Sequence, residues 1–168
     1  MSCLFLQLLP FSLNLSYTSK TLALRRGVVY NTCVRSAMLY GSDTWAPRIA
    51  DLDRLKRNER GILRWMCGVR PGVRIGYSEL CRRLDIPELD AAICQKRLRW
   101  FGHASRSQDW INQCMQFEVE GTSRRGYFKT WSGTVKDDLR RRGIRESDVS
   151  DRDVWRKHVS SITIRTPN

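Results

Sequence analysis

Residues 91–106 read AAICQKRLRWFGHASR, an apolar start followed by cations, two large aromatic rings and a histidine. At helical spacing its cationic and apolar side chains separate onto different faces. The cationic face carries Lys96, Arg99, His103 and Arg106. The apolar face carries Cys94, Leu98 and Phe101. The pattern predicts an amphipathic helix over residues 90–105, with one face in a core and the other directed at an anion.

Outward from this segment, helical patterns recur along the chain and no strand pattern is convincing. The predicted helices span residues 21–40, 48–67, 77–84, 90–105, 110–117, 131–142 and 151–159. The predicted fold class is therefore all-α, an irregular helical array of five to seven short helices. Ser78 is a candidate N-cap, and Gly27 is expected to weaken the first helix.

Apolar periodicity assigns an inward face to each longer helix. In the first helix this face holds Leu22, Val29, Cys33, Met38 and Leu39. In the second it holds Leu52, Leu55, Ile62 and Met66. In the last helix, Trp155 is the expected core residue. Phe101 is assigned to the core, whereas Trp100 either packs in the core or stacks on nucleic-acid bases.

The chain is divided here into three parts: residues 1–20, residues 21–72 and residues 73–168. The first part is apolar and is expected to be poorly ordered. It contains no cation before Lys20 and no small-residue cleavage site, so a secretory signal is disfavoured. The apolar run is also too short to span a bilayer. Exposed apolar residues in this part and on the helices favour self-association.

The charge balance is strongly basic, with 30 Lys and Arg against 17 Asp and Glu in 168 residues. A net charge of +13 attracts polyanions and makes their binding salt-dependent. Acidic membranes, acidic protein tails and RNA all have the required charge, and nucleic acid is favoured among them. Besides the cationic face of residues 90–105, one stripe holds Arg57, Arg60 and Arg64. A loop adds Arg124, Arg125 and Lys129. Solvated helix faces are the plain alternative for these residues.

The six cysteines are widely spaced and have no CxxC pair, which is typical of reduced thiols in an intracellular protein. A zinc site from Cys94, His103 and Cys114 is disfavoured, because zinc motifs pair ligands two to five residues apart. A cysteine nucleophile lacks an oriented partner. The sequence predicts no metal and no cofactor.

Several motifs, in order, resemble the region that follows the polymerase palm in non-LTR retrotransposon (LINE-type) reverse transcriptases. They are YNTCVRSAMLYGSDTW at 30–45, RWMCGV at 64–69, RLRWFGH at 97–103, VEG at 119–121, KTW at 129–131, VKDDL at 135–139 and DRDVWR at 151–156. The resemblance covers roughly residues 20–160. It implies that residues 21–72 are thumb-like helices and that residues 73–168 form the C-terminal helical tail.

In that family the catalytic aspartates lie upstream, in the palm. The only adjacent aspartates here are Asp137 and Asp138, on a predicted helix surface, whereas two-metal catalysis needs converging carboxylates. The expected protein is a non-catalytic fragment that binds RNA or an RNA–DNA duplex through its phosphates. Two alternatives stay open: a protein-interaction module with exposed amphipathic helices, and a degenerate gene product with no selected function.

Overall fold

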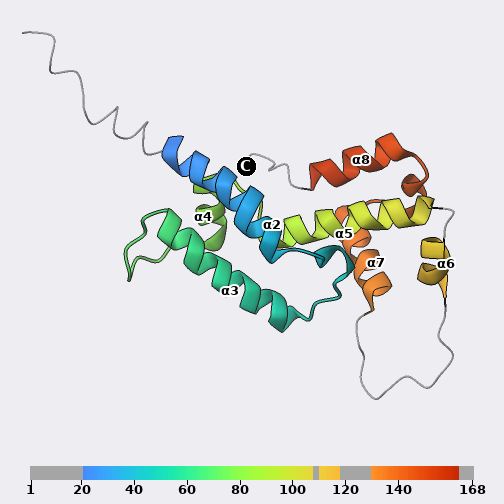
Figure 1. Cartoon of the computed structure of the whole chain (residues 1–168), viewed down its shortest axis with the longest axis horizontal. Helices are drawn as coiled ribbons and strands as arrows, with labels where there is room; N and C mark the ends of the chain where they lie inside the picture. The colour runs from blue at the N-terminus through green and yellow to red at the C-terminus, as the bar shows by residue number, and fades with distance from the viewer. Residues whose placement is uncertain (1–20, 108–109, 118–129, 163–168) are drawn as a thin grey trace, which may run out of the picture. The chain divides into compact units, whose positions relative to one another are not determined.

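The structure, a computed structural model, describes residues 21–107, 110–117 and 130–162 (Figure 1). Within these ranges the regular elements are helical and no strand occurs, which confirms the predicted all-α array. Residues 21–29 are α-helical and continue into a π-helix, η1 (Tyr30–Val34), and into α2 (Arg35–Met38). The remaining elements are η2 (Ser42–Thr44), α3 (Ile49–Met66), α4 (Tyr77–Leu84), α5 (Leu89–Arg106), α6 (Trp110–Gln116), α7 (Trp131–Arg142), η3 (Glu146–Val149) and α8 (Arg152–Ser161).

The described residues form two compact units that interleave along the chain. The first unit contains residues 21–38 and 57–86, and the second contains residues 39–56 together with the described residues from 87 onward. Helix α3 supplies its first half to the second unit and its second half to the first. The sequence analysis divided the helical part of the chain into two continuous stretches at residue 72. In the structure, each unit instead combines segments that are separated in the sequence.

The first unit is built around a small apolar core. Its buried residues are Tyr30, Leu63, Met66, Leu80, Cys81, Leu84 and Ile86. Gly27 lies against α4 so closely that an added Cβ would sit 1.9 Å from the carbonyl oxygen of Leu84. The glycine that was expected to weaken the first helix is therefore the residue that lets this helix approach α4.

The π-helix changes which residues of the first helix face inward. The Arg35 backbone N–H donates to the Tyr30 carbonyl five residues earlier, and the Tyr30 and Arg35 side chains are both buried. The predicted inward face is wrong in part: Leu22, Val29 and Cys33 are exposed. Before η1, the inward positions are Ala23, Gly27 and Tyr30 at ordinary α-helical spacing, so the large apolar side chains of this stretch indicated the wrong face. The extra residue of η1 then moves the next inward position to Arg35.

Helices α3 and α4 also differ from the prediction in detail. Met66 is buried as expected, but Ile62 is exposed and Glu59 is completely buried in its place. Helix α4 begins after Gly76 without a side-chain cap, so Ser78 lies inside the first turn and is not the N-cap.

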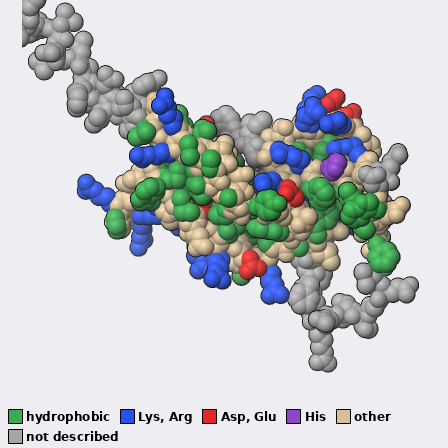
Figure 2. Space-filling model, viewed as in Figure 1, with side chains coloured by type: hydrophobic (Ala, Val, Ile, Leu, Met, Phe, Trp, Pro, Cys, Tyr) green, Lys and Arg blue, Asp and Glu red, His purple; other side chains and the backbone are tan. Residues whose placement is uncertain are grey.

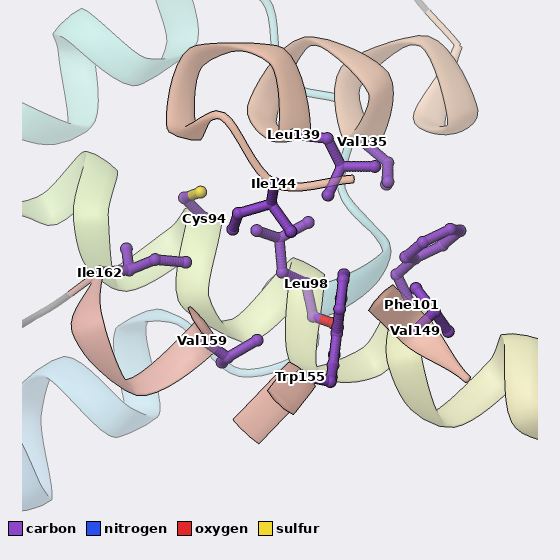
Figure 3. Close-up of a cluster of buried hydrophobic side chains, with 10 residues drawn as sticks. All are labelled: Cys94, Leu98, Phe101, Val135, Leu139, Ile144, Val149, Trp155, Val159 and Ile162. Atoms are coloured by element: carbon purple, nitrogen blue, oxygen red, sulfur yellow. The ribbon is translucent and has the colours of Figure 1, made fainter. Parts of the chain in front are cut away.

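The second unit packs around α5, which contacts α6, α7 and α8 (Figure 1). Figure 3 shows its core, in which Leu98 and Phe101 of α5 meet Leu139 of α7 and Trp155 of α8. The Trp155 indole N–H donates to the Leu98 carbonyl at 3.2 Å, and its ring centroid lies 6.0 Å from that of Phe101. The core assignments of Phe101 and Trp155 are confirmed.

Side-chain caps and close packing fix the ends and the contacts of α7 and α8. Thr130 caps α7, and the Asp151 carboxylate accepts hydrogen bonds from the first turn of α8. Gly102 allows Trp155 to approach α5, because a Cβ there would lie 2.0 Å from the indole nitrogen.

None of the helices in the described ranges has both the length and the apolar character needed to cross a bilayer.

Candidate nucleic-acid interface

Two arginines of the predicted α3 stripe hold the loop between α3 and α4. The Arg60 guanidinium donates to the Ile75 carbonyl at 2.6 Å. The Arg64 guanidinium donates to the carbonyls of Val73 at 2.9 Å and Arg70 at 3.1 Å. These bonds leave both cations at the surface while they fix the backbone of residues 70–75.

The fixed loop presents two further arginines that the sequence analysis missed. Arg70 and Arg74 are both exposed, and Arg57 is exposed on α3 nearby in sequence. We call Arg57, Arg60, Arg64, Arg70 and Arg74 the arginine loop surface. Figure 2 shows Lys and Arg side chains projecting around this loop. The signal in the sequence is the alternation of arginine with turn residues in RPGVR at 70–74, which helix periodicity does not detect.

Positive charge is concentrated in the first unit. Its described residues include ten arginines against three acidic residues, and one of the three, Glu59, is buried. The second unit has 15 basic and 11 acidic residues among those described. A polyanion is therefore attracted more strongly to the first unit, where few carboxylates oppose it.

The buried carboxylate of Glu59 organises the unit beneath this surface. It accepts hydrogen bonds from the Tyr30 hydroxyl at 3.0 Å and from Nε and Nη2 of Arg35 at 2.9 and 2.6 Å. The Tyr77 hydroxyl donates to its other oxygen. Burial, together with the nearby Glu59 charge, raises the pKa of Tyr30. The network joins the first helix, α3 and α4. It therefore holds in place α3 and α4, the two helices between which the loop of residues 70–75 runs.

The four residues of the predicted cationic face of α5 fall into two groups, two that donate to backbone carbonyls and two that are exposed to solvent. Lys96 donates to the Leu39 carbonyl at 3.2 Å, and Arg106 donates to the Val149 carbonyl at 2.9 Å. Arg99 and His103 are exposed. Lys96 and Arg106 therefore bind the protein's own backbone, while Arg99 and His103 face solvent. The predicted site residues Arg124, Arg125 and Lys129 lie outside the described residues.

The adjacent aspartates of α7 face different partners. Asp137 lies 3.3 Å from Arg140 at the surface, whereas Asp138 is buried and lies 3.3 Å from the buried guanidinium of Arg97. The prediction of a solvated pair is wrong for Asp138, because Arg97 turns into the core beside it.

In the part of the chain that the structure describes, no group of three Cys, His, Asp or Glu side chains is placed to hold a metal ion.

The first unit also carries an apolar groove of about 640 Å³ between its first helix and α3. Val29, Val34, Ile62 and Trp65 line it and are exposed. Arg25 and Arg26 are the charged residues of its lining, and Arg26 also donates to the Met66 carbonyl at 3.0 Å.

Comparison of the chain with protein-family models, curated proteins and solved structures found no match. The resemblance to LINE-type reverse transcriptases thus stays a prediction that rests on the motifs of the sequence.

Proposed function

We propose that this protein binds nucleic acid through phosphate contacts made by the arginine loop surface. The observation that carries the proposal is the bonding of Arg60 and Arg64 to the loop backbone, which displays Arg70 and Arg74 on a fixed support. Arginine matches phosphate geometry with several donors, and a fixed loop loses little conformational entropy on binding. Such contacts position a strand without reading its sequence.

The proposed ligand is RNA or an RNA–DNA duplex, in keeping with the resemblance to the region that follows a reverse-transcriptase palm. We propose no chemistry for the chain itself. In support, Glu59 is enclosed by three bonded side chains, and the carboxylates of Asp137 and Asp138 face separate arginines. Metal-dependent primer extension by the purified protein would contradict this part of the proposal.

The test compares two double variants with the same loss of charge. Arg70→Gln with Arg74→Gln removes two cations of the loop. Arg82→Gln with Arg83→Gln removes two cations of the same unit that pair with Glu79 on α4. Affinity for a 20-nucleotide RNA is measured by fluorescence anisotropy across a range of salt concentrations.

We expect the loop variant to lower the slope of log K against log salt by about 1.4 to 1.8, the share of two phosphate contacts. The α4 variant is expected to leave the slope nearly unchanged. Equal loss in both variants would show that net charge, and not the loop, governs binding.

The groove of the first unit supports a second candidate function, a protein-interaction module. Its aliphatic floor suits the apolar face of a helix, and Arg25 and Arg26 suit a partner whose flank is acidic. The test is titration with an acidic amphipathic helical peptide, in which Val29→Asp is expected to abolish binding. A matched change outside the groove, Val73→Asp, is expected to have no effect. Equal loss in both variants would reject this candidate.

A further inference from the structure

The second unit carries a groove whose lining is unusually aromatic. It encloses about 520 Å³ beside α5, α6 and the start of α7. Its lining residues are Trp100, Trp110, Ile111, Cys114, Met115, Phe117, Trp131 and Ser132. Half of these are large aromatic rings, and none carries a charge.

Part of this groove is held rigidly by contacts with the rest of the unit. The Trp131 indole N–H donates to the Asp43 carbonyl at 2.9 Å, and the ring lies 6.2 Å from Phe101. The Trp100 ring lies 5.6 Å from the ring of His103. The hydrogen bond and the Phe101 contact therefore set the orientation of Trp131 before any ligand arrives, and Trp100 adds a second half-buried ring to the lining.

The other two rings of the lining are largely open to solvent. Trp110 is 69% exposed and Phe117 is 74% exposed. A single exposed ring is common on a protein surface, but several exposed rings gathered in one groove form an apolar patch, and such patches mark interaction sites. The groove of the first unit has a mainly aliphatic lining, whereas this one offers several flat π-faces to a ligand.

Charge around the groove indicates the class of ligand. Arg99 and His103 are exposed on α5, in the turns that flank Trp100, and the lining itself contains no carboxylate. Single-stranded nucleic-acid binders combine aromatic rings, on which bases stack, with cations that follow the backbone. We propose that this aromatic groove binds unpaired bases of single-stranded RNA or DNA.

The inference rests on the proposed nucleic-acid binding and adds a strand preference to it. The arginine loop surface would supply phosphate contacts to any strand, whereas the groove would accept only bases that are free of a duplex. The base-stacking step and the phosphate-binding step therefore involve different residues in different units, and they can be tested separately.

The experiment uses the full chain, a 12-nucleotide uridine-rich RNA and a 12-base-pair duplex, each measured by fluorescence anisotropy. The variants are Trp110→Ala and Phe117→Ala, and Tyr40→Ala is the matched control. Tyr40 is 85% exposed and belongs to the second unit, but it lies outside the groove. Each groove variant is expected to weaken single-strand binding by about 5-fold to 160-fold, the range for loss of one stacked base. Duplex affinity should change less than twofold, and Tyr40→Ala should change neither affinity.

Trp110→Tyr keeps a stacking ring and is expected to retain most of the single-strand affinity, which separates stacking from loss of fold. The inference is overturned if the groove variants bind the single strand as tightly as the parent, if both strand types weaken equally, or if Tyr40→Ala has the same effect. If the parent protein still binds the duplex in a salt-dependent way in these cases, the proposed binding of nucleic acid through phosphate contacts is retained and only the groove inference is rejected. A parent protein that binds neither strand type would reject both.

Discussion

At the scale of single residues, Glu59 shows how a buried charge determines the structure around it. Its carboxylate is enclosed by Tyr30 and Arg35, which come from the first helix, and by Tyr77 of α4. A carboxylate buried in this way is stable only because each neighbour donates to it. The same neighbours depend on Glu59, since the guanidinium of Arg35 is also buried.

Glu59→Gln is therefore expected to destabilise the first unit strongly. The change keeps the side-chain volume but removes the carboxylate charge that pairs with buried Arg35, a loss of about 3–5 kcal/mol for a broken buried pair. Urea unfolding followed by circular dichroism measures it. Glu79→Gln serves as the control, because Glu79 pairs with Arg82 and Arg83 at the surface and its loss should change the midpoint little. Similar midpoints for both variants would contradict the structural role of Glu59.

Ionisation of the Cys94 thiol is expected to lower the free energy of unfolding at alkaline pH. Burial, followed by the charge of nearby Asp138, raises the pKa of its thiol from 9.0 to about 11. The unfolded chain releases this proton first, so the contribution of the thiol to stability is complete below pH 9 and is lost as the pH rises through 11. Unfolding free energies at pH 8 to 11 should therefore decline less steeply for Cys94→Ala than for the parent. Parallel curves would show that the thiol is not protected by burial.

At the scale of elements, the first helix combines a π-helix with a close approach to α4. The extra residue of η1 turns Tyr30 and Arg35 toward Glu59, and Gly27 brings the backbone of the same helix against Leu84. The polar network around Glu59 and the close contact at Gly27 therefore position this helix. A continuous apolar stripe contributes less to its packing than helix periodicity predicts. This arrangement explains why Val29 and Val34 remain at the surface and line a groove.

A pair of glycine substitutions separates close approach from helix propensity. Gly27→Ala would place a Cβ against the backbone of Leu84, and we expect a loss of about 1–3 kcal/mol, as for overpacked sites. Gly61 lies on α3 with open space around its Cα, so Gly61→Ala should stabilise the protein by about 0.5–1 kcal/mol. Thermal unfolding of both variants checks the signs. A stabilising effect at Gly27 would mean that the first helix does not pack against α4.

At the scale of the whole molecule, each unit depends on segments that are far apart in the sequence. The second unit needs residues 39–56, because η2 packs on α5 and the Asp43 carbonyl accepts the Trp131 N–H. Lys96 likewise donates to the Leu39 carbonyl. A tail that begins at residue 73 lacks these partners.

Fragments of the chain test this dependence. We expect residues 39–168 to retain a cooperative thermal transition followed by tryptophan fluorescence, whereas residues 73–168 should lose it or melt at a much lower temperature. The shorter fragment exposes part of α5 and removes the acceptor of the Trp131 indole. Equal transitions for the two fragments would show that the tail folds without residues 39–56. A cooperative melt of the full chain would also oppose the alternative of a degenerate product that folds poorly.

Local signals in the sequence determined the helical class and much of the second unit. Apolar spacing located α5, α7 and α8, and it assigned Phe101 and Trp155 to the core, because helix period and large aromatic side chains act over a few residues. The basic character of residues 57–64 was also evident from composition alone.

Which charged residues are buried and which remain at the surface depends on how the helices pack, and no pattern along the chain indicates it. Burial of Glu59 requires Tyr30, Arg35 and Tyr77, and the loop of Arg70 and Arg74 requires Arg60 and Arg64. The aromatic groove likewise combines α5, α6 and α7. These features depend on donors and acceptors that meet only after the helices pack, and a periodic pattern within one helix contains no information about its neighbours.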